Sequence, residues 1–289
     1  MTDPVVVVGG GHNGLVAACY LARAGQPVVV LEAAERLGGG SRTDETLPGH
    51  RFNTHSAAHN IINMTRIPRE LDLAGAGLEY VPMEPFATGV FRDGTVVRFA
   101  RSIDETVEGI AEIDRAEADA YAAFMRRAVP LVKTAVTGLE SGSTPGGVLR
   151  AAADKVLPLL QGVRRNGGPI GLARDLVAPY GALLERDLVS DLVRAPVAAF
   201  ASHSSAGPHQ PGGSFYVFWQ AAYHLFGQWH PLGGSQSLTD ALERRLRSWG
   251  GEARTSSPVA RIEVRGGRAV GVELEDGSRV AASAVVTAV

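Results

Sequence analysis

Three glycines near the start of the chain, Gly9, Gly11 and Gly14, have the spacing of a turn that binds a dinucleotide. Four valines precede them, and an apolar helical pattern follows. In such a turn the first glycine permits a tight bend, the second lets the backbone approach a pyrophosphate, and the third lets helix and strand pack closely. The N–H groups and partial positive charge at the start of the helix attract the phosphates. The pattern favours dinucleotide binding over a merely tight strand-to-helix turn.

A carboxylate and a second glycine segment follow this turn. Glu32 ends the next valine-rich strand, and its side chain can accept hydrogen bonds from ribose hydroxyls. A 2′-phosphate would put a second negative charge opposite Glu32, which disfavours NADP. Beyond it, the segment Gly38–Gly40 is flanked by Arg36 and Arg42. A simple nicotinamide-binding domain does not need this segment, whereas a longer flavin dinucleotide can use its backbone and the charge of Arg36 or Arg42. The alternative is a plain surface loop.

The elements that position these residues are predicted to form a parallel sheet. Residues 5–8 and 28–31 are apolar strands without polar alternation, and a helix over about 13–24 joins them, so the strands are expected to be buried on both faces. Near the other end, strands over 259–264, 268–274 and 278–281 are separated by turn residues and predict a meander. A further strand is expected over 284–289.

The middle of the chain reads as mostly helical. An Asp-Gly pair at 93–94 predicts a hairpin with a type I′ turn. Short helices are expected over 141–171, which is rich in Gly and Pro, and a longer helical stretch over about 172–200. Three residue pairs have the spacing of helix-capping boxes: Ser102 with Glu105, Asp114 with Glu117, and Ser237 with Asp240.

Composition excludes several classes of protein. The 289 residues are 45% hydrophobic, enough for one large domain or two ordinary ones, and the net charge of -2 offers no electrostatic footprint for nucleic acid. No apolar run reaches the roughly 20 residues that cross a bilayer. The N-terminus lacks the basic segment of a signal peptide, so a cytoplasmic location is expected. The single cysteine, Cys19, excludes an internal disulfide and is expected to pack in a core.

Other candidate sites are weaker. His55 and His59 have helical spacing, but no Glu follows the first and no third ligand is placed, so no metal site is predicted. The aromatic stretch over 215–229 suits either the wall of an apolar tunnel or an ordinary core. The serines beside His203 lack a nucleophile elbow, which makes a hydrolase improbable.

The arrangement of the three glycines, Glu32 and Arg36-x-Gly38-Gly39 resembles the FAD-dependent phytoene desaturase and amine oxidase superfamily. In particular it resembles the phytoene dehydrogenase-like branch, which includes the pyridine nucleotide-disulfide oxidoreductase domain-containing protein 2 type. Segments at 231–235, 251–252, 258–262 and 284–286 occur in the same order in that family.

The resemblance implies an α/β fold: a Rossmann-like FAD-binding domain with a parallel sheet and β-meander, formed by residues 1–75 and 231–289, plus a partial α+β substrate or cap domain over 76–230. Family members continue further, so the C-terminal half of their architecture is absent here. His55, Ser56 and His59 are expected to line the substrate cavity, unless they are ordinary turn residues. The expected FAD-binding residues are Gly9, Gly11, Asn13, Gly14, Glu32, Ala33, Arg36, Gly38, Gly39, Ser41, Arg42 and, through its backbone, Val259.

The implied activity is an FAD-dependent oxidoreductase that moves hydride from an apolar small-molecule substrate to flavin. The cofactor carries the redox chemistry, so no catalytic acid or base is assigned. Two alternatives are a non-catalytic or split nucleotide-binding half that needs a complementing C-terminal chain, and an NAD-dependent dehydrogenase. Peripheral membrane contact suits an apolar substrate, although the sequence has no strongly basic amphipathic helix.

Overall fold

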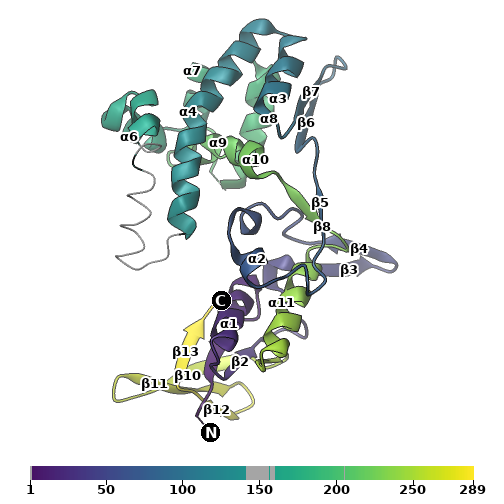
Figure 1. Cartoon of the computed structure of the whole chain (residues 1–289), viewed down its shortest axis with the longest axis vertical. Coiled ribbons are helices and arrows are strands. Elements are labelled where there is room, and N and C mark those ends of the chain that lie inside the picture. Colours follow the sequence, from purple (N-terminus) through teal and green to yellow (C-terminus); the bar gives the residue numbers. More distant parts are fainter. Residues whose placement is uncertain (1, 141–155, 157–159, 205) are drawn as a thin grey trace. The chain divides into compact units, whose positions relative to one another are not determined.

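The computed structural model describes residues 2–140, 156, 160–204 and 206–289. The chain divides into two compact units: unit 1 comprises Met1–Val81 with Trp229–Val289, and unit 2 comprises Pro82–Gln228. The chain leaves unit 1 through β5 (Tyr80–Pro82) and returns through β8 (Trp229–Pro231), and these two strands pair with each other (Figure 1). Most of the predicted short helices over 141–171 lie outside the described residues.

Four parallel strands form the sheet of unit 1, in the order β13-β1-β2-β9. Two helices pack on one face, and a three-stranded antiparallel meander packs on the other (Figure 1). The sheet strands are β1 (Val5–Val8), β2 (Val28–Leu31), β9 (Glu252–Arg254) and β13 (Ala284–Thr287). The helices are α1 (His12–Arg23) and α11 (Gln236–Ser248), and the meander is β10 (Val259–Arg265), β11 (Arg268–Leu274) and β12 (Arg279–Ala281).

The core of unit 1 lies on both sides of this sheet, as the unbroken valine runs predict. Val5 and Val7 pack in a cluster with the helices, whereas Val6 packs in a second cluster on the meander side. Cys19 is fully buried in the helix-side cluster, and its Sγ donates to the Leu242 carbonyl at 3.2 Å. Burial raises the pKa of this thiol to about 12, so its predicted packing role is confirmed.

Small elements connect β2 to β5 in unit 1. They are η1 (Gly39–Ser41), the hairpin of β3 (Thr43–Leu47) and β4 (His50–Asn53), η2 (Ile62–Met64) and α2 (Ile67–Glu70).

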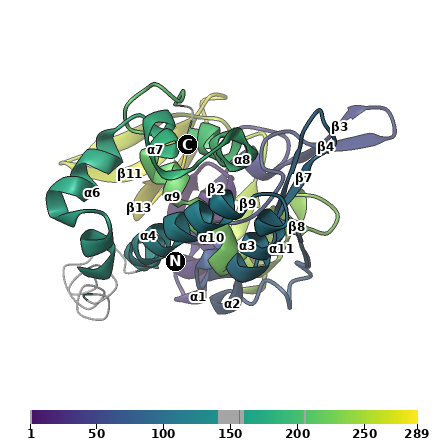
Figure 2. The ribbon, with the colours of Figure 1, turned by 90° about the horizontal axis from the view of Figure 1, so that it is seen from above.

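Unit 2 is a hairpin followed by helices, and α4 packs against α3, α9 and α10 (Figure 2). The stretch predicted as helical over 172–200 is divided among α6, α7 and α8, because α7 begins after Pro179 and α8 begins after Ser190. The elements are β6 (Ala87–Val90), β7 (Val96–Phe99), α3 (Ile103–Ala111), α4 (Arg115–Glu140), α6 (Gly168–Val177), α7 (Tyr180–Asp187), α8 (Asp191–Ala201), η3 (Ser202–Ser204), α9 (Ser214–Phe218) and α10 (Gln220–Phe226).

Aromatic side chains fill the core of unit 2. Phe218 is fully buried and stacks on Phe124 with ring centroids 5.7 Å apart. The Tyr121 hydroxyl lies 2.6 Å from Nε2 of His224, and burial lowers the pKa of that histidine to about 4. These contacts support the core interpretation of the aromatic stretch rather than a tunnel wall.

Two local predictions are wrong in detail. The hairpin between β6 and β7 does not have a type I′ turn, because that turn requires positive φ at both central residues and Asp93 lacks it; Gly94 alone has a φ of 88°. The predicted cap of the last helix is also displaced. Helix α11 begins after Ser235, and Ser237 Oγ instead donates to the Leu232 carbonyl at 2.7 Å.

The two capping boxes of unit 2 have different outcomes. Ser102 caps α3 by accepting from the Glu105 N–H, as predicted. At α4, Asp114 accepts the N–H of Glu117, but the Glu117 side chain does not close the box. Its carboxylate is buried and accepts from the backbone N–H and Oγ of Ser190, at 2.7 and 2.9 Å. Glu117 therefore holds the start of α8 against α4.

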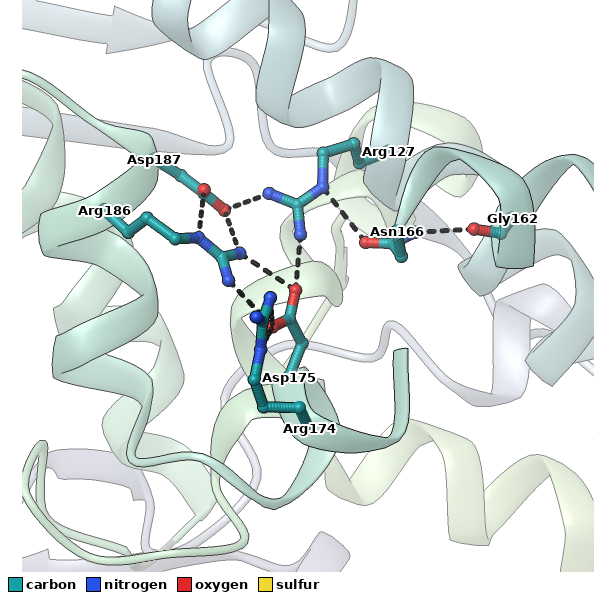
Figure 3. A network of polar contacts seen from close by, with 7 residues as sticks. All are labelled: Arg127, Gly162, Asn166, Arg174, Asp175, Arg186 and Asp187. Carbon is teal, nitrogen blue, oxygen red and sulfur yellow. Dashed lines mark hydrogen bonds and ion pairs between the residues drawn. The ribbon is translucent and has the colours of Figure 1, made fainter. Parts of the chain in front are cut away.

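A charge network ties α4, α6 and α7 together (Figure 3). Asp175 on α6 is 1% exposed and pairs with Arg127 of α4 at 2.7 Å and with Arg186 of α7 at 2.8 Å. Burial alone would raise the pKa of Asp175, but hydrogen bonds from Arg186 and Arg174 and the nearby positive charges lower it below its usual range. Asp187 pairs with both Arg127 and Arg186. The network therefore compensates the buried Asp175 carboxylate through groups on three helices.

Candidate cofactor-binding site

The first glycine turn connects β1 to α1, and its three glycines have different surroundings. Gly9 has a φ of 104°, a conformation that favours glycine. A Cβ on Gly14 would lie 2.1 Å from the Gly9 carbonyl oxygen, so only glycine permits this approach of helix and turn. A Cβ on Gly11 would meet nothing within 4 Å. The space beside Gly11 is therefore open, as a ligand that approaches the backbone there requires.

The second glycine turn lies directly against the first. The Gly38 N–H donates to the Gly10 carbonyl at 2.9 Å, and Gly11 and Gly38 form an isolated parallel bridge. Gly38 and Gly39 have φ values of 134° and 53°, and a Cβ on Gly39 would lie 3.2 Å from Gly11 Cα. The structure therefore brings together two glycine segments that are separated by a helix and a strand.

Helix α1 begins beside both turns, and its own first turn carries no negative charge. Its N-cap is Gly11, which offers no side-chain cap, and its first turn contains no acidic residue. Asn13 lies in that first turn with an exposed side chain. The start of the 12-residue helix therefore presents its N–H groups and dipole to an anion.

Glu32 lies at the end of β2, next to the first turn. Its Oε2 accepts from the Gly10 N–H at 2.6 Å, and its Oε1 accepts from the Ala34 N–H at 2.9 Å, which also fixes the intervening Ala33. Because a carboxylate has about four acceptor directions, Glu32 retains capacity to accept from ribose hydroxyls.

The start of the meander is tied to the segment after β2. The Ser257 N–H donates to the Glu32 carbonyl at 2.8 Å, and the Ser256 N–H donates to the Ala34 carbonyl at 2.9 Å. Val259 follows as the first residue of β10 and packs, partly buried, on the meander-side cluster. Glu32 and Val259 therefore lie at the same end of the sheet, although they are far apart in the sequence.

The two arginines near the second glycine turn are paired with a carboxylate that the sequence did not single out. Arg42 bonds to Asp44 through Nε and Nη2, at 3.2 and 2.8 Å, and Arg36 lies 3.6 Å from the same Oδ1. The hydrogen bond from Arg42 is the main reason that the pKa of Asp44 is lowered. Both arginines are thus oriented towards Asp44 in the structure.

The loop that carries His55, Ser56 and His59 reaches the second glycine turn through Ser56, whose N–H donates to the Gly40 carbonyl at 3.1 Å. His59 is 5% exposed and lies 2.8 Å from the Tyr80 hydroxyl and 3.2 Å from Ser235 Oγ. Burial is the main cause that lowers its pKa to about 4, so the imidazole is neutral at neutral pH. His55 is exposed.

A polar network at the start of α11 supports the second glycine turn, and the sequence patterns did not reveal it. The Gln236 side-chain amide donates to the Leu37 carbonyl at 3.2 Å and to Thr239 Oγ1 at 2.9 Å. The Gln236 N–H donates to Thr43 Oγ1, which in turn donates to Asn53. Only the run Gly233-Gly234-Ser235 before the helix could have drawn attention to this region.

The described residues contain neither a membrane-spanning helix nor a cluster of metal-binding side chains. None of the described helices is long and apolar enough to cross a membrane. Within the same residues, no group of three or more His, Cys, Asp or Glu side chains is placed to hold a metal ion.

Two protein families match separate parts of the chain. The NAD(P)-binding Rossmann-like domain matches residues 7–69, which contain both glycine turns and Glu32. The flavin containing amine oxidoreductase family matches residues 180–289, which contain α11 and the meander.

Individual relatives align with nearly all of the chain. Pyridine nucleotide-disulfide oxidoreductase domain-containing protein 2 of Mus musculus is 31% identical over 98% of this chain and 52% of its own length. The neurosporene-forming phytoene desaturase of Rhodobacter capsulatus is 28% identical over 98% of this chain and 51% of its own length. The chain therefore spans about half the length of these curated relatives.

Solved structures share the fold. Wild-type putrescine oxidase bound to putrescine aligns with a TM-score of 0.60 and 20% identity, covering 100% of this chain and 58% of the oxidase. A fatty acid isomerase from P. acnes aligns with a TM-score of 0.61 and 15% identity, covering 99% of this chain and 59% of the isomerase. Its two family matches and these relatives show that the chain is similar to flavin containing amine oxidoreductases and phytoene desaturases.

Proposed function

We propose that this protein is an FAD-dependent oxidoreductase of the dehydrogenase or desaturase type, which passes hydride from an apolar small molecule to the flavin. The observation that carries the proposal is the hydrogen bond between the two glycine turns, Gly38 N–H to Gly10 carbonyl, at the uncapped start of α1. The apolar substrate is supported by the phytoene desaturase among the relatives, since phytoene is a hydrocarbon.

The residues at this site fit FAD. The open space beside Gly11 admits a pyrophosphate to the backbone, and the first turn of α1, which contains no acidic residue, supplies N–H donors. Glu32 supplies acceptors for ribose hydroxyls, and the Val259 segment lies at the same end of the sheet, where the adenine is expected. The second glycine turn extends this surface beyond what a nicotinamide dinucleotide needs.

When bound, FAD supplies the hydride-accepting ring. The chain's own residues bind and orient it: the glycine turns hold the phosphates, and Glu32 fixes the ribose. His59 remains uncharged and holds its loop against Tyr80 and Ser235. Its role is therefore to position the loop and not to supply a charge.

The proposed partners are the apolar substrate and a separate electron acceptor. The single buried cysteine suits a reducing compartment such as the cytoplasm. No comparison favours the alternative of a non-catalytic half.

Gly11→Val gives a sharp test. The substitution fills the space beside the turn, and Gly11 has an extended backbone, φ -69° and ψ 169°, that valine adopts readily. We expect the purified wild type to take up about one FAD per chain, seen by flavin absorbance and by chromatography of the released cofactor. Gly11→Val should keep the far-UV circular dichroism of the wild type and lose FAD.

Two results would overturn the proposal. A folded wild type that takes up no FAD, or that takes up NADH instead, would remove the flavin role. Equal FAD uptake by Gly11→Val and wild type would show that the pyrophosphate does not approach the backbone at Gly11.

A further inference from the structure

His12 connects the two glycine turns through its side chain. It is the first residue of α1, and its Nδ1 lies 3.4 Å from Ser41 Oγ in η1. Ser41, the partner of His12 in this contact, is 3% exposed, so its position is fixed by the residues packed around it. The imidazole therefore spans from the start of the helix, where the pyrophosphate is expected, to the second turn.

The other ring nitrogen of His12 is available to a ligand. Among the described residues, Nε2 of His12 has no hydrogen-bond partner. The ring is partly buried, and burial lowers the pKa of His12 below its usual value. The imidazole is consequently neutral at neutral pH, and one nitrogen must act as acceptor and the other as donor.

No negative charge on the surrounding elements stabilises a proton on His12. The first turn of α1 contains no acidic residue. Asp44 in β3 is negatively charged, but it is paired with the Arg42 guanidinium. The titratable neighbours in the adjoining loop and β8 are His59, which is neutral above about pH 4, and His230, whose Nδ1 lies 2.9 Å from the Ala57 carbonyl. The Glu32 carboxylate bonds to the Gly10 and Ala34 N–H groups.

We propose that His12 takes up a proton from solvent when the pyrophosphate of FAD binds, so that its imidazolium donates Nε2–H to a phosphate oxygen and FAD binding strengthens as pH falls. This inference rests on the proposed FAD-binding function. A pyrophosphate brings negative charge to the start of α1, and a nearby negative charge favours the protonated form of an imidazole. The bound state therefore holds more protons than the free state, which is the condition for tighter binding at lower pH.

The test is the FAD dissociation constant of the cofactor-free chain, measured by flavin fluorescence from about pH 6 to about pH 8.5, where an imidazole titrates. We expect the wild-type affinity to rise by up to about tenfold for each unit of falling pH. His12→Gln, which keeps a hydrogen-bonding group but cannot titrate, should bind more weakly at low pH and show a flat profile. His230→Gln, the matched control, should keep the wild-type slope.

Proton uptake gives a second readout that does not depend on activity. Calorimetric titration with FAD in two buffers of different ionisation enthalpy should show uptake of up to about one proton per FAD for the wild type and none for His12→Gln. Urea unfolding of the cofactor-free variants checks that each is folded; if His12→Gln is not, His12→Asn replaces it.

The outcomes separate this inference from the proposed function. FAD binding that is equally strong at all pH values in the wild type, or a pH slope that survives in His12→Gln, would overturn the role of His12 and leave the FAD site in place. A folded wild type that binds no FAD at any pH would overturn the FAD site itself, and the inference with it.

Discussion

The close contact between Gly14 and the Gly9 carbonyl predicts that Gly14→Ala lowers the free energy of unfolding. Replacing a glycine by alanine inside a helix ordinarily stabilises it by about 1 kcal/mol. At Gly14, however, the added Cβ would lie 2.1 Å from the Gly9 oxygen, far inside contact distance. Because that oxygen belongs to the backbone, it cannot move aside as a side-chain end would.

The magnitude follows from these opposing terms. Overpacking costs about 1 to 3 kcal/mol, and a rigid backbone contact belongs at the upper end of that range. With the helix gain subtracted, we expect Gly14→Ala to lose about 2 kcal/mol of unfolding free energy, or about 30-fold in the folding equilibrium. FAD affinity should fall as well, since relief of the clash displaces the first glycine turn.

Gly109 in α3 provides the matched control, because a Cβ there would meet nothing within 4 Å. Gly109→Ala should gain up to about 1 kcal/mol and keep wild-type FAD affinity. The assay is urea unfolding followed by far-UV circular dichroism, with hydrogen exchange of α1 and α3 to assign each change to its unit. Wild-type stability and FAD affinity in Gly14→Ala would refute the close approach on which the reasoning depends.

Three further predictions concern buried polar groups. Asp175→Asn should destabilise unit 2 by about 1 to 3 kcal/mol, because it removes the charge of a buried carboxylate that accepts hydrogen bonds from Arg127 and Arg186. Asp119→Asn, which removes the exposed ion pair of Asp119 with Arg115, should change stability by less than about 0.5 kcal/mol; thermal unfolding compares the two. Since the folded-state pKa of Asp175 is lowered, its contribution is complete above the unfolded value of about 3.9 and is lost as pH falls through the folded-state pKa. Wild-type stability should therefore fall in acid more steeply than that of Asp175→Asn, and parallel acid profiles would contradict this. Gln236→Leu removes the donor to the Leu37 carbonyl and should weaken FAD binding about tenfold, in line with a hydrogen-bond loss of about 1 to 3 kcal/mol. Ser237→Ala should leave FAD binding unchanged. Equal FAD affinities of the two variants in fluorescence titrations would show that Gln236 of α11 does not support the second glycine turn.

Local patterns predicted those parts of unit 1 in which neighbours in sequence are neighbours in space. The turn from β1 to α1, Glu32 at the end of β2 and the meander were all readable, because glycine conformation, capping chemistry and side-chain periodicity act over a few residues. The second glycine segment was expected to serve a longer flavin dinucleotide, but its position against the first turn was seen only in the structure.

Features that depend on distant partners were not readable. Glu117 has the spacing of a capping residue, yet its carboxylate binds Ser190, which a local rule cannot anticipate. Arg36 and Arg42 were expected to offer charge to a flavin cofactor, and their spacing gave no sign that both also pair with Asp44. Gln236 supports the Leu37 carbonyl across nearly 200 residues of chain, by a contact between two elements whose adjacency only the fold decides.

The division of unit 1 between two distant stretches of chain has a consequence for biosynthesis. Strand β1 pairs with β2 soon after both are made, but its other neighbour, β13, begins at Ala284. Unit 2, by contrast, is continuous from Pro82 to Gln228 and emerges whole from the ribosome before α11, the meander and β13 exist. Because domains generally fold as units during synthesis, unit 2 is expected to become protease-resistant while β1 still has an open edge. Strand β1 therefore keeps one unpaired edge until β13 has been made.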